Sequence, residues 1–383
     1  MKAVNPATGE LIRDYPDHDD AQVNEILARA EAAFASWRKV PFAERSRLMT
    51  RVADLLRDRA GDYGRTMTEE MGKTIAASEA EIDKCAWVCD FYAEHAERFL
   101  AQETVATDAT RSFIRYEPLG PVLAIMPWNF PFWQLFRFAA PALMAGNVGL
   151  LKHASNVPGC ALAIEEVFRD AGFPDGAMTT LLISSEKVKR VISQRQIRAV
   201  TLTGSEKAGI EVATEAGKNL KKTVLELGGS DPFIVLGDVD PVEAARQAAK
   251  ARTINSGQSC IAAKRFLVEE SIADRFEEEF AQAMAALKVG DPMDRGNDLG
   301  PMAREDLLND LDDQVRRTVA AGATLRTGGY RLEGQGFYYA PTVLTGVEPG
   351  MAAFDEETFG PVAAVTRARD ANHAVELANL STL

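Results

Sequence analysis

The 383-residue sequence has few residues of the types that form disulfide frameworks and metal sites. Its four cysteines and four histidines are scattered, without a Cys-x-x-Cys pair or a His-Glu-x-x-His segment, so we expect no bound metal. The chain also lacks any run of 18 apolar residues, and its N-terminus lacks the apolar core of a signal peptide. These absences disfavour secretion and membrane spanning, and they predict a cytoplasmic protein.

Positive charge is scarce as well. The chain has 43 Lys and Arg residues against 56 Asp and Glu residues, which gives a net charge of −13 and a pI near 5.0. Such a charge repels nucleic acid and anionic membrane surfaces, so we expect neither as a main partner and favour small molecules instead. With 46% hydrophobic and 26% charged residues, a chain of this length is typical of two or three globular domains.

The hydrophobic pattern changes twice along the chain. Residues 20–100 have the period of three helices, and the segment that follows alternates like an exposed strand. From residue 121, apolar strands alternate with helical segments, which predicts a parallel sheet, and a second such series begins after Gly229. We therefore expect an α/β fold with two parallel-sheet domains, at residues 1–228 and 229–383, and a small β arm at about residues 101–120.

Polar segments follow the expected strands of the first sheet. These strands lie at residues 122–126, 148–152, 178–183, 199–203 and 223–227. Ligands of parallel sheets bind at the carboxyl ends of the strands, so the residues that follow these ends are the candidates for a binding site.

Three of these candidates suit cofactor or oxyanion binding. Asn129 lies between two prolines that stiffen its backbone, so its amide could donate to an oxyanion or cap the following helix. At Gly204 and Ser205 a strand enters a helix, whose free amides could hold a pyrophosphate, although a plain helix cap has the same pattern. Lys152 closes a strand and could donate to ribose hydroxyls or point into water.

Two further candidates suit covalent chemistry. Cys260 follows a short polar loop that contains a glycine, which favours a reactive thiolate, although a lone cysteine is more often a small buried hydrophobic residue. Glu226 ends an apolar run and precedes two glycines, so it would leave a buried strand where backbone can approach a ligand closely. A strand-end charge that faces water would have the same pattern.

Four motifs, in this order, resemble the aldehyde dehydrogenase superfamily: PWNFP at 127–131, LTGSxxxG at 202–209, LELGG at 225–229 and GQSC at 257–260. Segments at 290–292, 299–301, 340–343 and 357–361 extend the resemblance along nearly the whole chain. Bacterial NAD(P)-dependent succinate-semialdehyde dehydrogenases are the most similar members. The resemblance implies an aldehyde dehydrogenase-like fold, with an NAD(P)-binding domain at 1–228, a catalytic domain at 229–383 and an arm used for oligomerisation.

The resemblance also implies roles for single residues. Cys260 would attack the aldehyde as a thiolate, the Asn129 amide would hold the oxyanion, and Glu226 would activate the water that hydrolyses the thioester. NAD or NADP would be the cofactor, bound by Pro127, Trp128, Lys152, Ser155, Gly204, Ser205, Leu227, Glu357 and Phe359. The partners would be a small aldehyde substrate and, in a full-length chain, further copies in a dimer or tetramer.

Two departures from the family pattern concern specificity. Ser155 stands where NAD-selective relatives often carry a glutamate, and because a serine cannot repel a 2′-phosphate, the choice between NAD and NADP stays open. Arg137 matches an arginine that semialdehyde dehydrogenases use for the substrate carboxylate, although it could also be a surface charge of a helix. A second such arginine is expected six residues before Cys260, where this chain has Ile254.

The family continues beyond the position of Leu383, so we expect a C-terminally truncated member. The expected activity is the NAD(P)-dependent oxidation of succinic semialdehyde to succinate through a cysteine thiohemiacetal and thioester. The alternatives are a dehydrogenase for another small aldehyde and, in a different class, a truncated non-catalytic remnant that binds nucleotide.

Overall fold

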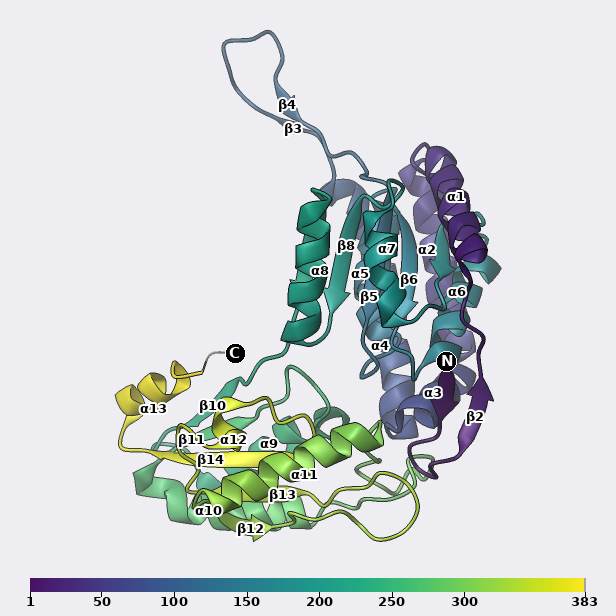
Figure 1. Cartoon of the computed structure of the whole chain (residues 1–383). Coiled ribbons are helices and arrows are strands. Elements are labelled where there is room, and N and C mark those ends of the chain that lie inside the picture. Colours follow the sequence, from purple (N-terminus) through teal and green to yellow (C-terminus); the bar gives the residue numbers. More distant parts are fainter. Residues whose placement is uncertain (382–383) are drawn as a thin grey trace. The chain divides into compact units, whose positions relative to one another are not determined.

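The computed structural model describes residues 1–381, and the chain separates into two compact units (Figure 1). Unit 1 comprises Met1–Ala3, Leu11–Glu70 and Ser78–Leu227, and unit 2 comprises Val4–Glu10, Met71–Ala77 and the chain from Gly228 onward. Each unit contains a five-stranded, mainly parallel sheet with helices, so the expected α/β fold is confirmed. The two short N-terminal stretches in unit 2 left no signal in the sequence. None of the helices in the described chain is long and apolar enough to cross a membrane.

Between residues 20 and 99, where the sequence predicts three helices, the structure has four. They are α1 (Asp20–Trp37), α2 (Phe42–Asp58), α3 (Ala60–Met71) and α4 (Ile75–Phe99). The three expected helices correspond to α1, α2 and α4, so the prediction was wrong in lacking α3. Gly61 lies inside α3, and a glycine disfavours a helix interior, which explains why this helix was missed. Gly72, directly after α3, has a φ of +88°.

The sheet of unit 1 has the strand order β7-β6-β5-β8-β9, and all its pairs are parallel. Its strands are β5 (Pro121–Met126), β6 (Val148–His153), β7 (Met178–Thr180), β8 (Ala199–Thr203) and β9 (Lys222–Glu226). The connecting helices are α5 (Trp133–Met144), α6 (Pro158–Asp170), α7 (Ser185–Ser193) and α8 (Glu206–Lys218). The chain winds outward from β5 in one direction and then from β8 in the other, so the strand order reverses between these two neighbours (Figure 1).

Strand β9 is an exposed edge, not the buried strand that its apolar run predicts. It pairs with β8 on one side only, and Val224, in its middle, is 62% exposed. The prediction was wrong because an apolar run does not distinguish a central strand from an edge strand. Glu226 therefore ends a strand that is open to solvent along one side.

Two small antiparallel sheets complete the strands of the N-terminal half. One is formed by β1 (Lys2–Val4) and β2 (Leu11–Asp14). The other is the expected arm, in which β3 (Glu103–Thr104) pairs with β4 (Phe113–Ile114). The arm extends away from the sheet of unit 1 (Figure 1), and both residues of β4 are exposed.

The sheet of unit 2 has the order β10-β11-β14-β13-β12 and is parallel except for the edge pair β12–β13. Its strands are β10 (Pro232–Val235), β11 (Arg265–Glu269), β12 (Thr324–Thr327), β13 (Thr342–Thr345) and β14 (Val362–Ala368). Its helices are α9 (Pro241–Arg252), α10 (Glu270–Ala285), α11 (Glu305–Ala320), α12 (Ala352–Asp355) and α13 (Ala371–Ala378).

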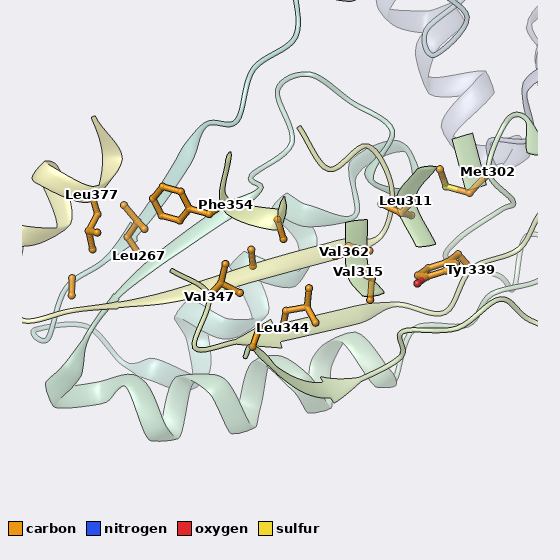
Figure 2. Packing of buried hydrophobic residues seen from close by; sticks show 14 of the residues in the cluster. Leu267, Met302, Leu311, Val315, Tyr339, Leu344, Val347, Phe354, Val362 and Leu377 are labelled. Carbon is orange, nitrogen blue, oxygen red and sulfur yellow. The ribbon is translucent and has the colours of Figure 1, made fainter. Parts of the chain in front are cut away.

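Both faces of this second sheet are covered, which explains its continuous apolar strands. Side chains alternate along a strand, so Phe266 of β11 lies in one core cluster with residues of α9 and α10. The next residue, Leu267, belongs to the opposite cluster, which includes Leu311 of α11 and Phe354 of α12. Figure 2 shows this second cluster, in which Leu344 of β13 points to the same side as Leu267.

A buried carboxylate holds the start of α6. Glu70 of α3 is 2% exposed, and its two oxygens accept hydrogen bonds from the amides of Gly159 (2.8 Å) and Cys160 (2.9 Å). These amides are free at a helix N-terminus, so Glu70 satisfies them from a distant helix. Burial raises the pKa of Glu70 to about 7, although the two amides oppose the shift.

We predict that Glu70→Gln makes stability less dependent on pH. The folded protein keeps this carboxyl protonated to about pH 7, while an ordinary glutamate ionises near 4.5. The folded state thus binds more protons in this interval, so the free energy of unfolding falls as pH rises through it, by roughly 3 kcal/mol. Urea unfolding at pH 5 and pH 8 measures the effect. Glu69→Gln, on the same helix but partly exposed, is the control, and equal pH dependence in wild type and Glu70→Gln would contradict the assignment.

Candidate active site

The candidate residues of unit 1 gather at the carboxyl edge of its sheet. The strand register pairs Met126 with His153, and Thr203 with Glu226. Strands β5 and β8 are neighbours, so the segments that follow them leave the sheet side by side where the strand order reverses. This is the position at which parallel α/β sheets bind their ligands.

A helix N-terminus lies at this edge. The Gly204 amide donates to the Glu226 carbonyl (3.0 Å), and Ser205 is the N-cap of α8, whose side chain accepts from the Ala208 amide (3.4 Å). A Cβ on Gly209 would lie 2.6 Å from Leu227, so glycine lets the first turn of α8 pack against this side chain. The structure thus contains the helix cap, and the cap leaves the positive end of α8 directed to the same edge.

The segment after β6 has buried polar groups that suit a ribose. Lys152 is 8% exposed, and burial lowers the pKa of its ammonium, with Asp17 opposing the shift. Asn156 is also buried, and within residues 1–381 neither its amide nitrogen nor its amide oxygen has a hydrogen-bond partner. Ser155 between them is exposed and carries no charge. Buried polar groups are normally hydrogen-bonded, so this segment fits a polar ligand with hydroxyl or phosphate groups.

A neutral histidine joins this segment to the one after β5. His153 accepts from the Ala154 amide at Nδ1 (2.9 Å), so its proton lies on Nε2, which donates to the Pro131 carbonyl (2.9 Å). Burial lowers the pKa of His153 to about 4, and the ring is therefore uncharged at neutral pH. The two segments that flank Asn129 and Lys152 are held together by this ring.

Asn129 is buried and does not cap the helix that follows it. Helix α5 has Phe132 as its N-cap residue, without a side-chain cap of its own. The amides of Phe132 and Trp133 donate instead to Glu81 of α4, both at 2.9 Å. The capping alternative for Asn129 is therefore wrong, and Glu81 is a residue of the site region that the sequence did not reveal.

Glu226 and Arg137 form an ion pair. Arg137 of α5 is 33% exposed, and its Nη2 lies 3.3 Å from Oε2 of Glu226, which is 54% exposed. The same Nη2 donates to the Thr203 hydroxyl (3.3 Å). The sequence did not indicate this partner, because it comes from a strand 89 residues further along the chain.

In unit 2, the expected nucleophile ends a strained loop. Residues Asn255 and Ser256 of the short 3₁₀ segment η1 (Ile254–Gly257) both have φ of 55°, an unfavourable conformation for residues with a side chain. Gly257 continues this conformation, and a Cβ there would lie 2.1 Å from the Gly360 carbonyl. Of the four cysteines, which all lie in the described chain, Cys260 alone is not buried.

Two buried cations hold this loop. The Arg252 guanidinium donates to the carbonyls of Gly257 (2.6 Å) and Thr358 (3.4 Å). The Lys264 ammonium, 0% exposed, donates to the Cys260 carbonyl (2.7 Å) and lies 3.2 Å from the Glu357 carboxylate. Burial lowers the pKa of Lys264, whereas Glu357 opposes this shift. The cysteine backbone and the carboxylate expected at the cofactor are thus fixed by one ammonium.

The remaining expected residues fall into two groups. In unit 1, the side chains of Pro127, Trp128 and Leu227 are half-buried near the strand ends. In unit 2, Phe359 is half-buried next to Glu357, and a Cβ on Gly228 would lie 2.3 Å from the Glu357 carboxylate, which would have to move. Ile254, at the position of the missing second arginine, is 40% exposed.

Comparison with known proteins agrees with this geometry. A probable succinate-semialdehyde dehydrogenase [NADP(+)] of Synechocystis sp. is 53% identical over 99% of this chain and 84% of its own. A succinate-semialdehyde dehydrogenase [NADP(+)] of Mycobacterium avium is 51% identical over 100% of this chain and 82% of its own. The crystal structure of succinic semialdehyde dehydrogenase from Streptococcus pyogenes in complex with NADP+ matches with a TM-score of 0.97 and 36% identity, over 99% of this chain and 84% of that one.

The family model described as "Aldehyde dehydrogenase family" matches residues 1–383. The motifs, the fold of both units and the relatives agree, and the chain belongs to the aldehyde dehydrogenase family.

Proposed function

We propose that the protein is an NADP-dependent succinate-semialdehyde dehydrogenase, which oxidises succinic semialdehyde to succinate. Relatives that are 51–53% identical over nearly the whole chain carry this name. Neither a dehydrogenase for a different aldehyde nor a non-catalytic nucleotide-binding remnant is favoured by these relatives.

One observation carries the choice of substrate. Arg137 presents a partly exposed guanidinium at the carboxyl edge of the unit 1 sheet, next to the carboxylate of the candidate base Glu226. A charged hydrogen bond from such a group to the far carboxylate of a semialdehyde contributes about 1.5–3 kcal/mol, which is roughly ten- to hundredfold in specificity. An uncharged aldehyde of the same length gains nothing from it.

The reaction follows from three groups of the chain. The Cys260 thiolate attacks the aldehyde carbon and forms a carbon–sulfur bond, while the Asn129 amide donates to the resulting oxyanion. Bound NADP+ supplies the hydride acceptor. Loss of the hydride leaves a thioester on Cys260, and Glu226 then takes a proton from the water that attacks this thioester. Succinate is released and the thiolate is regenerated.

The residues present suit NADP+. Lys152 and Asn156 offer donors for the ribose that bears the 2′-phosphate, and Ser155 carries no charge that would repel the phosphate. The N-terminus of α8 at Gly204 and Ser205 would take the pyrophosphate. Glu357 and Phe359 would take the nicotinamide ribose and ring, and Pro127 and Trp128 would also contact the cofactor.

We predict that Cys260→Ala abolishes NADPH formation from succinic semialdehyde and leaves NADP+ binding nearly intact, because the thiolate forms the covalent bond. NADPH absorbance and a binding titration measure the two effects. Cys89→Ala, which changes a buried cysteine of α4, is the control and should retain most activity. Residual turnover above about 1% in Cys260→Ala would rule out the nucleophile assignment.

We predict that Ser155→Glu selectively weakens use of NADP+. A carboxylate beside the 2′-phosphate costs about 1–3 kcal/mol, so kcat/KM for NADP+ should fall about ten- to hundredfold while that for NAD+ changes little. Ser155→Gln has a side chain of the same length without charge and is the matched control. An unchanged cofactor preference in Ser155→Glu would show that this residue does not face the 2′ position.

We also propose that copies of the chain associate through the arm. Support comes from Phe113 and Ile114, two exposed apolar side chains in a two-stranded sheet whose edges can accept another strand. The double change Phe113→Ser with Ile114→Ser should lower the mass measured by light scattering in solution. Leu162→Ser, which removes an exposed side chain of α6, is the control, and an unchanged oligomer in the arm variant would exclude this surface.

A further inference from the structure

The ion pair between Arg137 and Glu226 joins two groups with separate tasks. Arg137 reaches from α5 to the end of β9, where its Nη2 lies 3.3 Å from the Glu226 carboxylate. The Thr203 hydroxyl accepts from the same nitrogen, and the register places Thr203 directly beside Glu226. Arg137, which is expected to bind the substrate carboxylate, is therefore paired with Glu226, the expected general base.

Arg137 and Glu226 are each less available while they are paired. The Glu226 oxygen that lies against the guanidinium is less accessible to water. The positive charge of Arg137 is partly balanced by Glu226, so it attracts a substrate carboxylate less strongly. Each residue is fully available only when the pair separates.

Unit 1 offers room for a competing anion beside the pair. A groove of about 620 Å³ is lined by Arg137 and Glu226, and its other lining residues are apolar or neutral except for Lys222. Two of the three charged residues in the lining are thus cations, which favours an anion over a neutral molecule.

We propose that the carboxylate of the substrate releases the general base: it pairs with Arg137, displaces Glu226, and leaves Glu226 able to activate water. This rests on the proposed function. The substrate carboxylate then acts at two steps: it contributes to binding, and it promotes hydrolysis of the thioester. An aldehyde without a carboxylate forms its thioester on Cys260 but leaves Glu226 paired with Arg137.

The exposure of the pair sets the size of the effect. The Arg137 side chain is 33% exposed and the Glu226 side chain is 54% exposed. Ion pairs with this much exposure are weak because water screens the two charges. The pair therefore exchanges readily, and its loss shifts the population of unpaired Glu226 by about two- to fivefold.

The test uses an ester, so that it needs no cofactor. The Cys260 thiolate attacks the carbonyl of p-nitrophenyl butyrate, p-nitrophenolate leaves, and the butyryl thioester is then hydrolysed by water. The initial burst of p-nitrophenolate reports acylation, and the steady rate that follows reports hydrolysis of the thioester. We expect Arg137→Leu to raise the steady rate about two- to fivefold with little change in the burst.

Three variants complete the experiment. Arg137→Gln also removes the charge and should show the same gain, so the test does not depend on the folding of one variant. Arg57→Leu removes another half-exposed ion pair of unit 1, with Asp90, and should leave the steady rate unchanged. In the double variant Arg137→Leu with Glu226→Gln the gain should disappear, because no base is left to release.

Separate measurements test the release of Glu226 and the proposed dehydrogenase function. A steady rate that is unchanged or lower in both Arg137 variants overturns the release of Glu226, whereas a gain that persists with Glu226→Gln overturns the role of this carboxylate in it. The proposed function is judged by NADPH formation instead, with succinic semialdehyde and butyraldehyde as substrates. If Arg137→Leu lowers kcat/KM equally for both aldehydes, Arg137 does not bind the substrate carboxylate.

Discussion

The parallel pairing of β5 with β6 on one side and β8 on the other is the constraint on which the candidate site of unit 1 depends. Parallel strands bring their carboxyl ends to one edge, so residues from four distant segments lie there together. The helix that follows β8 begins at this edge and directs its amides to it. The same pairing leaves β9 at the sheet margin, where Glu226 is accessible enough to accept a proton and to exchange partners.

In unit 2, buried cations stabilise the strained loop that precedes Cys260. The loop before Cys260 has two residues in a left-handed conformation, and such a loop persists only where its surroundings hold it. Arg252 and Lys264 do so by donating to its carbonyls, and Lys264 also neutralises the Glu357 carboxylate. A buried ammonium is costly without a partner, so the loss of Glu357 or of Lys264 would leave an uncompensated charge close to the backbone of Cys260.

Much of the fold and the motif residues could be predicted from the sequence, because strands, glycine-bounded turns and the spacing of Glu226 and Cys260 are local patterns. Hydrogen-bond and ion-pair partners that are distant in the sequence could not be predicted. Glu70 and Glu81 cap helices that begin 88 and 52 residues later, and neither position differs from an ordinary helix charge in the sequence. Helix α3 was missed for a local reason, because Gly61 lies inside it and a glycine indicates a break rather than a helix interior. The ion pair between Arg137 and Glu226 could not be predicted, because it depends on the register between β8 and β9, and the sequence of one segment does not determine that register.

The covalent intermediate on Cys260 is the central claim, and intact mass measurement tests it most directly. The protein is mixed with NADP+ and succinic semialdehyde, quenched in acid within the first turnovers, and weighed before and after proteolysis. We expect a species heavier by about 100 Da, the mass of a succinyl group, on the peptide that contains Cys260. NADPH formation without such a species, or with the added mass on Cys85, Cys89 or Cys160, would contradict it.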